Sequence, residues 1–172
     1  MRLIAPSTLY QQQFIAFYRE IEAAGEENRE LYQPAQEDFQ NYVNEITLHA
    51  QGKNLPEGWV PSSTFWMVDD SDNIVGVVRI RHNINAPILR NEIGHIGYDI
   101  APSCRRKGYG TLILKMALSQ ARELGISKLR LTADENNLGS RKIIERNGGM
   151  LDELKQSDEF NRRTATYWID IK

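Results

Sequence analysis

The sequence predicts an α+β fold in which helices flank a mixed, mostly antiparallel central sheet. Two segments with helical periodicity precede any extended run of strands, and from residue 63 onward short strands alternate with two more helices. A chain of 172 residues has room for one ordinary domain but not for two. We therefore predict one domain over residues 1–172, with an N-terminal part (1–62) and a sheet-bearing core (63–171).

The N-terminal part is expected to hold a short strand and two helices. Thr8, with Gln11 three residues later, matches the capping box that starts a helix, and apolar residues then recur on one face as far as Gly25. An acidic linker follows to Pro34, where a second helix begins and continues to Gly52. Both helices therefore precede the main sheet.

The core is expected to contain a hairpin, two helices and a closing hairpin. A helix should follow the glycines at 108 and 110 and end at Gly125. The remaining predicted elements are strands at 63–70, 73–82, 95–100 and 127–133, a helix at 138–146, and strands at 150–154 and 164–171.

Charge is distributed unevenly along the chain. Residues 1–100 carry 7 Lys and Arg against 14 Asp and Glu, whereas residues 101–172 carry 14 against 9. A basic C-terminal half suits a polyanion, but a pI near 6.0 and the lack of a long basic stripe argue against nucleic acid. A small phosphorylated ligand fits better.

Cysteine content and hydropathy argue against several classes of protein. The single Cys104 excludes an internal disulfide and a multi-cysteine zinc site, and no metal ligand is assigned to the predicted site. The sequence shows neither the apolar run of a signal peptide nor a stretch long enough to span a bilayer. We therefore expect a cytoplasmic protein with no membrane partner.

Three consecutive cations, Arg105, Arg106 and Lys107, precede two glycines at the start of the predicted helix. The first N–H groups of a helix have no internal partner, and glycines allow a ligand to approach the backbone closely. This pattern favours a diphosphate. The spacing of these glycines matches neither the P-loop motif nor the dinucleotide-binding motif. The structural alternative is a tight strand-to-helix connection whose cations are simply solvated.

At these residues the chain resembles the GNAT superfamily of N-acetyltransferases. The acyl-CoA signature of that family, Arg or Gln, two residues, Gly, one residue, then Gly or Ala, is matched by residues 105–110. Residues 100–102 (Ile-Ala-Pro) resemble the end of its fourth strand, and residues 137–148 resemble its later N-x-x-[AS]…E-[KR]-x-G helix. The resemblance covers about residues 63–171 and extends to a bacterial subgroup of predicted acetyltransferases.

The resemblance implies a GNAT-like sheet with an acyl-CoA cleft between splayed strands and acetyl-CoA as cosubstrate. The turn would hold the pyrophosphate, and the pantetheine arm would lie between strands 95–100 and 128–133. For Asn137 and Ser140 helix capping is the alternative role. The residues assigned to acetyl-CoA are Ile100, Ala101, Arg105, Arg106, Lys107, Gly108, Tyr109, Gly110, Thr111, Asn137 and Ser140.

The resemblance also implies transfer to a primary amine by direct attack in a ternary complex. The general base is expected to be His95, then Glu92, although His95 could instead only pack the strand. Many family members carry a thiolate-protonating tyrosine where this chain has Ile144. Tyr98 is the candidate replacement, and Cys104 is expected to be an unreactive thiol.

The acceptor is expected to be an amine of a small molecule or peptide. Arg81 or His82 could hold a carboxylate on it, or could form a solvated strand face. The acidic stretch 20–38 could attract a cationic amine, or could be a solvated linker. The alternative function is a sensor that binds acyl-CoA without catalysing transfer. The absence of the family's usual tyrosine favours this alternative.

Overall fold

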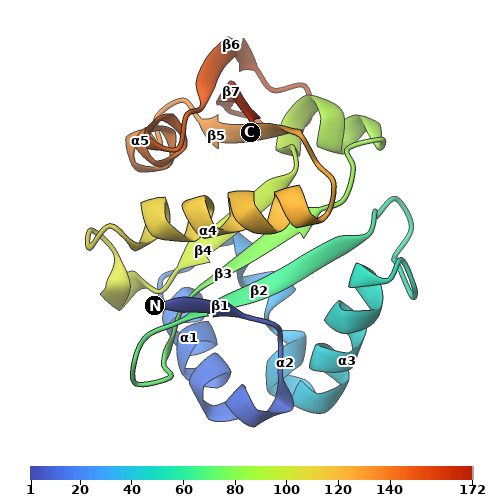
Figure 1. The fold of residues 1–172 in the computed structure, drawn as a ribbon, viewed down its shortest axis with the longest axis vertical. Coiled ribbons are helices and arrows are strands. Elements are labelled where there is room, and N and C mark those ends of the chain that lie inside the picture. The colour runs from blue at the N-terminus through green and yellow to red at the C-terminus, as the bar shows by residue number, and fades with distance from the viewer. Residues whose placement is uncertain (172) are drawn as a thin grey trace.

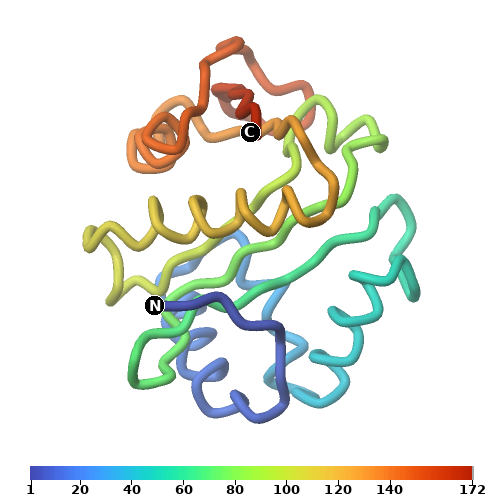
Figure 2. The backbone as a smooth tube through the Cα atoms, viewed as in Figure 1, coloured from blue at the N-terminus to red at the C-terminus, as the bar shows by residue number. Residues whose placement is uncertain are grey.

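The computed structural model describes residues 1–171 (Figures 1 and 2). Its strands are β1 (Arg2–Ile4), β2 (Ser62–Val68), β3 (Ile74–Arg81), β4 (Ile96–Ile100), β5 (Lys128–Asp134), β6 (Met150–Gln156) and β7 (Arg163–Asp170). Its α-helices are α1 (Gln11–Ala23), α2 (Pro34–Glu37), α3 (Phe39–Ala50), α4 (Tyr109–Glu123) and α5 (Leu138–Arg146). There are also short 3-10 turns, which are η1 (Thr8–Tyr10), η2 (Glu27–Leu31) and η4 (Pro102–Cys104). The segment η3 (Leu89–Ile93) is a π turn.

The strands form two sheets, in the orders β1-β2-β3-β4 and β5-β7-β6, and neighbouring strands are antiparallel. An isolated bridge between Gly94 and Leu131 links them just before β4 begins. Figure 1 shows α1, α2 and α3 on one side of the first sheet and α4 on the other. The predicted fold class, helices around a mostly antiparallel sheet, is confirmed.

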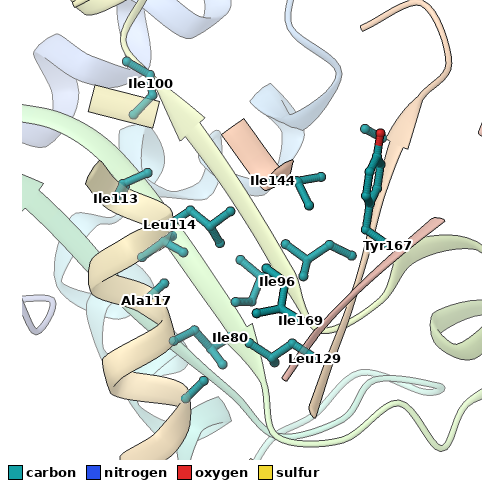
Figure 3. Packing of buried hydrophobic residues seen from close by; sticks show 14 of the residues in the cluster. Ile80, Ile96, Ile100, Ile113, Leu114, Ala117, Leu129, Ile144, Tyr167 and Ile169 are labelled. Atoms are coloured by element: carbon teal, nitrogen blue, oxygen red, sulfur yellow. The ribbon is translucent and has the colours of Figure 1, made fainter. Parts of the chain in front are cut away.

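Two hydrophobic clusters fix this arrangement. One cluster, rich in aromatic rings such as Phe14 and Trp66, joins the N-terminal helices to the first sheet. The other joins both sheets to α4 and α5. Figure 3 shows its side chains, which include Ile80, Ile96, Ile113, Leu114, Leu129, Ile144 and Ile169. Because one core reaches both sheets from the α4 side, it fixes the position of β5 relative to β4 although the two strands are not paired.

The N-terminal part differs from the sequence prediction in local detail. Ser7, rather than Thr8, caps the first turn, and this turn is a 3-10 helix that precedes α1. The predicted acidic linker contains the 3-10 turn η2. The second helix is divided at Asp38, whose side chain accepts a hydrogen bond from the Asn41 N–H (2.9 Å) and so starts α3. The π turn η3 carried no sequence signal.

Within residues 1–171 no helix combines the length and the apolar character that crossing a membrane requires.

Candidate active site

The edge of β4 that faces away from β3 is unpaired. The Arg81 N–H donates to the His95 C=O (2.8 Å), and the Ala101 N–H donates to the Val75 C=O (3.0 Å). The backbone C=O and N–H groups of the odd-numbered residues in β4 therefore point toward β3. Since backbone groups alternate in direction along a strand, the even-numbered residues point their N–H and C=O groups away from β3, toward β5. These residues are Ile96, Tyr98 and Ile100.

The turn after this edge has the conformation of an anion cradle. Arg106 and Gly108 both have positive φ angles (64° and 83°), and such alternation aims neighbouring N–H groups into one concave surface. Gly108 is the N-cap of α4 and provides no side-chain cap. The first N–H groups of α4, from residue 109 to 111, are therefore available to a ligand at the positive end of the helix dipole.

Two cations of the turn are held by nearby groups. Nε of Arg105 donates to the Ile100 C=O (3.1 Å), and its Nη2 lies 2.7 Å from a carboxylate oxygen of Glu26. Nζ of Lys107 donates to the Ser103 C=O (3.0 Å). These contacts shape the turn and leave Arg105 at the end of the free β4 edge.

The two glycines of the turn have different roles. A Cβ at Gly110 would lie 2.5 Å from Cδ1 of Ile143, so Gly110 allows α4 to pack closely against α5. Gly110 therefore has a packing role in addition, and its proximity to phosphate stays a prediction. A Cβ at Gly108 would meet no protein atom within 4 Å and would project into open space. Of the two, Gly108 is the position where a ligand would meet an added side chain.

Replacing Gly108 by alanine should weaken CoA binding at least tenfold, about 1.4 kcal/mol, because the new Cβ would project into the space where we expect the CoA pyrophosphate. Gly125 is a matched control, since it ends the same helix with a φ of 79° and equally open surroundings. Both variants should lose about 1 kcal/mol of stability to left-handed strain. Calorimetry should show weaker CoA binding only for Gly108→Ala, and equal CoA affinities would contradict the cradle.

The N-terminus of α5 lies across from the free edge of β4. Oδ1 of Asn137 accepts a hydrogen bond from the Ser140 N–H (3.0 Å), so the capping role is confirmed for Asn137. Oγ of Ser140 lies 3.1 Å from Oη of Tyr98, which connects β4 to α5. Burial raises the pKa of Tyr98 to about 12, which keeps the phenol protonated at neutral pH. Ile144, at the family's tyrosine position, is buried in the core.

His95 precedes β4 and joins it to β5. Its Nδ1 accepts a hydrogen bond from the Arg130 N–H (3.0 Å), and its own N–H donates to the Arg130 C=O (2.8 Å). A ring nitrogen that accepts a hydrogen bond carries no proton, so any proton on the neutral ring is on Nε2. Burial, together with the charges of Arg81 and Arg130, lowers the pKa of His95, which keeps the imidazole neutral near pH 7.

Glu92 lies in η3 and is buried. Its carboxylate accepts a hydrogen bond from Oγ of Ser157 (2.7 Å) and is 3.3 Å from Nζ of Lys155. Burial raises the pKa of Glu92, but these partners outweigh burial and the net pKa is lowered. A carboxylate held in this way is a weak base, and its clearest role is to fasten η3 to the segment that joins β6 to β7.

Replacing Glu92 by glutamine should lower the free energy of unfolding by about 2 kcal/mol at pH 7, because a charged hydrogen-bonded group is lost. A depressed pKa in the folded state gives stability above the ordinary carboxyl value of 4.5, and that stability is lost as the pH falls through the folded value. Urea unfolding should therefore show the gap to wild type narrowing below about pH 4.5. Glu30→Gln, an exposed control, should show no gap at either pH.

A buried polar network that the sequence did not predict lies on the face of β3 and β4 opposite α4. Asp99 accepts hydrogen bonds from Nδ2 of Asn28 (2.9 Å), Oη of Tyr32 (2.5 Å) and Nη2 of Arg79 (3.1 Å). Tyr32 also accepts a hydrogen bond from Arg79. The only sequence signal was a charged residue in an apolar strand. The network holds the segment around η2 against this face.

The remaining predicted positions are separated from one another. Arg81 lies on the same face of β3 as Arg79, whereas Nε2 of His82 is 2.8 Å from Oγ of Ser63 on β2. Because Ser63 pairs with Ile80, whose side chain lies in the core under α4, this contact places His82 toward the opposite face from Arg81. Cys104 is a free, partly buried thiol that packs against both hydrophobic clusters.

Comparison with known proteins identifies the family. Residues 16–149 match the model of the acetyltransferase (GNAT) family. The chain belongs to this family. A search of curated proteins found no match.

Solved structures of similar fold include the microcin C7 self-immunity acetyltransferase MccE in complex with acetyl-CoA and AMP. Its TM-score is 0.72 at 15% identity, with 98% of this chain and 91% of that chain covered. The ribosomal L7/L12 α-N-protein acetyltransferase RimL in complex with coenzyme A has a TM-score of 0.72 at 17% identity, covering 98% and 93%. A chimeric spermidine N-acetyltransferase SpeG from Vibrio cholerae has a TM-score of 0.66 at 17% identity, covering 98% and 94%. All three similarities concern the fold.

Proposed function

We propose that this GNAT protein transfers an acetyl group from acetyl-CoA directly to a primary amine. The observation that carries the proposal is the free edge of β4, which ends in the anion cradle formed by residues 106–111. A diphosphate in the cradle would place the pantetheine arm along Ile96, Tyr98 and Ile100, whose backbone groups point toward β5. Acetyl-CoA-bound and CoA-bound structures of the same fold support this assignment.

The residues along this edge would divide the chemistry among them. Only a neutral amine attacks a carbonyl carbon, so the incoming ammonium group would first lose its proton, directly or through water, to Nδ1 of His95. This is the nitrogen of the neutral ring that has a lone pair, and it would have to release the Arg130 N–H to accept the proton. The Ile100 N–H would stabilise the negative charge that develops on the carbonyl oxygen. As the carbon–sulfur bond breaks, the hydroxyl of Tyr98, supported by Ser140, would donate a proton to the thiolate.

The alternative, a silent acyl-CoA sensor, rests on Ile144 at the usual tyrosine position. The Tyr98–Ser140 contact weakens that argument, because a protonated phenol is still available next to the free β4 edge. We therefore favour the enzyme.

The test is acetyl transfer from acetyl-CoA across a panel of primary amines, followed by detection of released CoA and of the acetylated product. We expect turnover with at least one class of amine, and no acetyl adduct on the protein by intact-mass analysis after acetyl-CoA alone. Tight acetyl-CoA binding without turnover on any amine would favour the sensor. A trapped acetyl group on Cys104 would replace direct transfer by a two-step route.

A further inference from the structure

Two arginines lie two residues apart on the face of β3 that is turned away from α4. Arg79 is paired with Asp99 (3.1 Å). Nη1 of Arg81 donates to the Gly94 C=O (3.2 Å), but among residues 1–171 no carboxylate lies within 4 Å of its guanidinium. Burial, and the positive charge of Arg79, lower the pKa of Arg81 to about 10. Burying a guanidinium without a counterion lowers the stability of the fold. Proteins commonly keep such an uncompensated charge at a ligand-binding site.

The same face has an unused hydrogen-bond donor beside Arg81. Nε of Arg79 is buried and has no hydrogen-bond partner. Gly97 lies directly across from Arg79 on β4, and a Cβ there would come within 3.5 Å of Nη2 and 3.9 Å of Nε. A strand position without a side chain therefore adjoins an unsatisfied guanidinium nitrogen. An anionic group bound here would satisfy both arginines.

The acidic segment 20–38 does not provide a competing site for a cation, because most of its carboxylates have internal partners. Glu26 binds Arg105 and Glu27 binds Arg162. The others with partners are Glu20, which accepts from the Ser103 N–H, Glu22, which accepts from the Tyr18 hydroxyl, and Asp38, which caps α3. Glu30 and Glu37 are exposed to solvent, so the partly buried charge without a counterion on this side of the sheet is that of Arg81.

We propose that the acceptor is an amine that carries a carboxylate close to its nitrogen, as an amino acid does, and that Arg81 and Nε of Arg79 bind this carboxylate. The inference rests on the proposed function. The Arg81 N–H bonds to the His95 C=O (2.8 Å), so an acceptor anchored by Arg81 presents its amine near the proposed base. Polyamines and protein N-termini have no such carboxylate and are disfavoured as acceptors.

The test compares L-amino acids with their carboxamides, which lack the anionic group. Rates are compared at a high pH where both amines are neutral, because the amide also has the less basic amine. For the wild type we expect kcat/KM at least tenfold higher for the acid than for the amide. Arg81→Gln keeps a donor for the Gly94 C=O but removes the charge, and should abolish the preference. Arg81→Lys should restore part of it. Arg19→Gln, which removes an exposed charge on α1, should change neither value.

Equilibrium binding separates this inference from the proposed reaction. N-acetyl-L-amino acids and their amides are titrated calorimetrically into the protein saturated with CoA, a measurement that needs no turnover. We expect the acid to bind at least tenfold more tightly than the amide, and Arg81→Gln to lose that difference while CoA affinity is unchanged. Equal affinity of the wild type for acid and amide, or a preference that survives in Arg81→Gln, overturns the carboxylate site.

Binding of the acid through Arg81 without acetyl transfer would support the site and overturn the reaction. Thermal unfolding gives a further check, because removing an uncompensated buried charge should leave Arg81→Gln as stable as the wild type or more so. A large loss of stability in both Arg81→Gln and Arg81→Lys, with CoA binding lost as well, would show that Arg81 supports the fold and would overturn its role as a ligand-binding residue.

Discussion

Replacing His95 by asparagine should lower kcat/KM for amine acetylation about a hundredfold near pH 7, because general-base catalysis contributes on that order. Asparagine is the informative substitution, since its Oδ1 can still accept the hydrogen bond that Nδ1 of His95 accepts from the Arg130 N–H. The contact between β4 and β5 is then preserved, whereas the nitrogen that accepts the proton is lost.

The pH dependence distinguishes a base from a structural residue. The lowered pKa of His95 means that the imidazole is neutral and able to accept a proton at pH 7, and that the wild-type rate should fall only at a pH below the ordinary histidine value of 6.5. At high pH the acceptor amine is already neutral, so the defect of His95→Asn should shrink there. CoA affinity, measured in parallel, should be unchanged. A variant with the wild-type rate from pH 6 to 9 would show that solvent deprotonates the amine.

Replacing Gly94 by alanine should be among the most destabilising changes in the chain, with a loss of about 3 kcal/mol or more in the free energy of unfolding. Gly94 has a φ of 84°, and a Cβ there would lie 2.4 Å from the carbonyl oxygen of Arg130 on β5. That oxygen belongs to the backbone and accepts the hydrogen bond from the His95 N–H. It can move only if β4 separates from β5 at the bridge.

Gly58 is the matched control for this substitution, because it has a φ of 78° and no protein atom within 4 Å of an added Cβ. Gly58→Ala should therefore lose only about 1 kcal/mol, the cost of left-handed strain. Thermal and urea unfolding of both variants measure the difference. An equal loss of unfolding free energy in the two variants would mean that the close contact between Gly94 and β5 adds nothing to the cost of left-handed strain. Because His95 follows Gly94 directly, Gly94→Ala should also impair acetyl transfer in the fraction that remains folded.

The site features that the sequence predicted are those that depend on neighbours in the chain. The cations and glycines of residues 105–110 act through the amides of the helix that they precede, and Asn137 caps α5 through the N–H of a residue three positions later. Helical periodicity likewise placed α4 and α5 close to their observed bounds. Such signals can be read without knowing how the chain folds back on itself.

The tertiary structure decided how side chains distant in sequence combine. Glu92 has the residue type of a general base, but its partner Ser157 is 65 residues away, and that contact holds the carboxylate as an anchor. Gly110 fits a phosphate motif, yet its nearest constraint is Ile143 on another helix. Arg79 and Arg81 are the same residue type on one strand, but Asp99, on β4, pairs with Arg79 only. Arg81 donates to the Gly94 C=O and has no carboxylate partner among residues 1–171. Charge compensation and packing depend on distances in space, which are set only when strands far apart in the sequence are brought together.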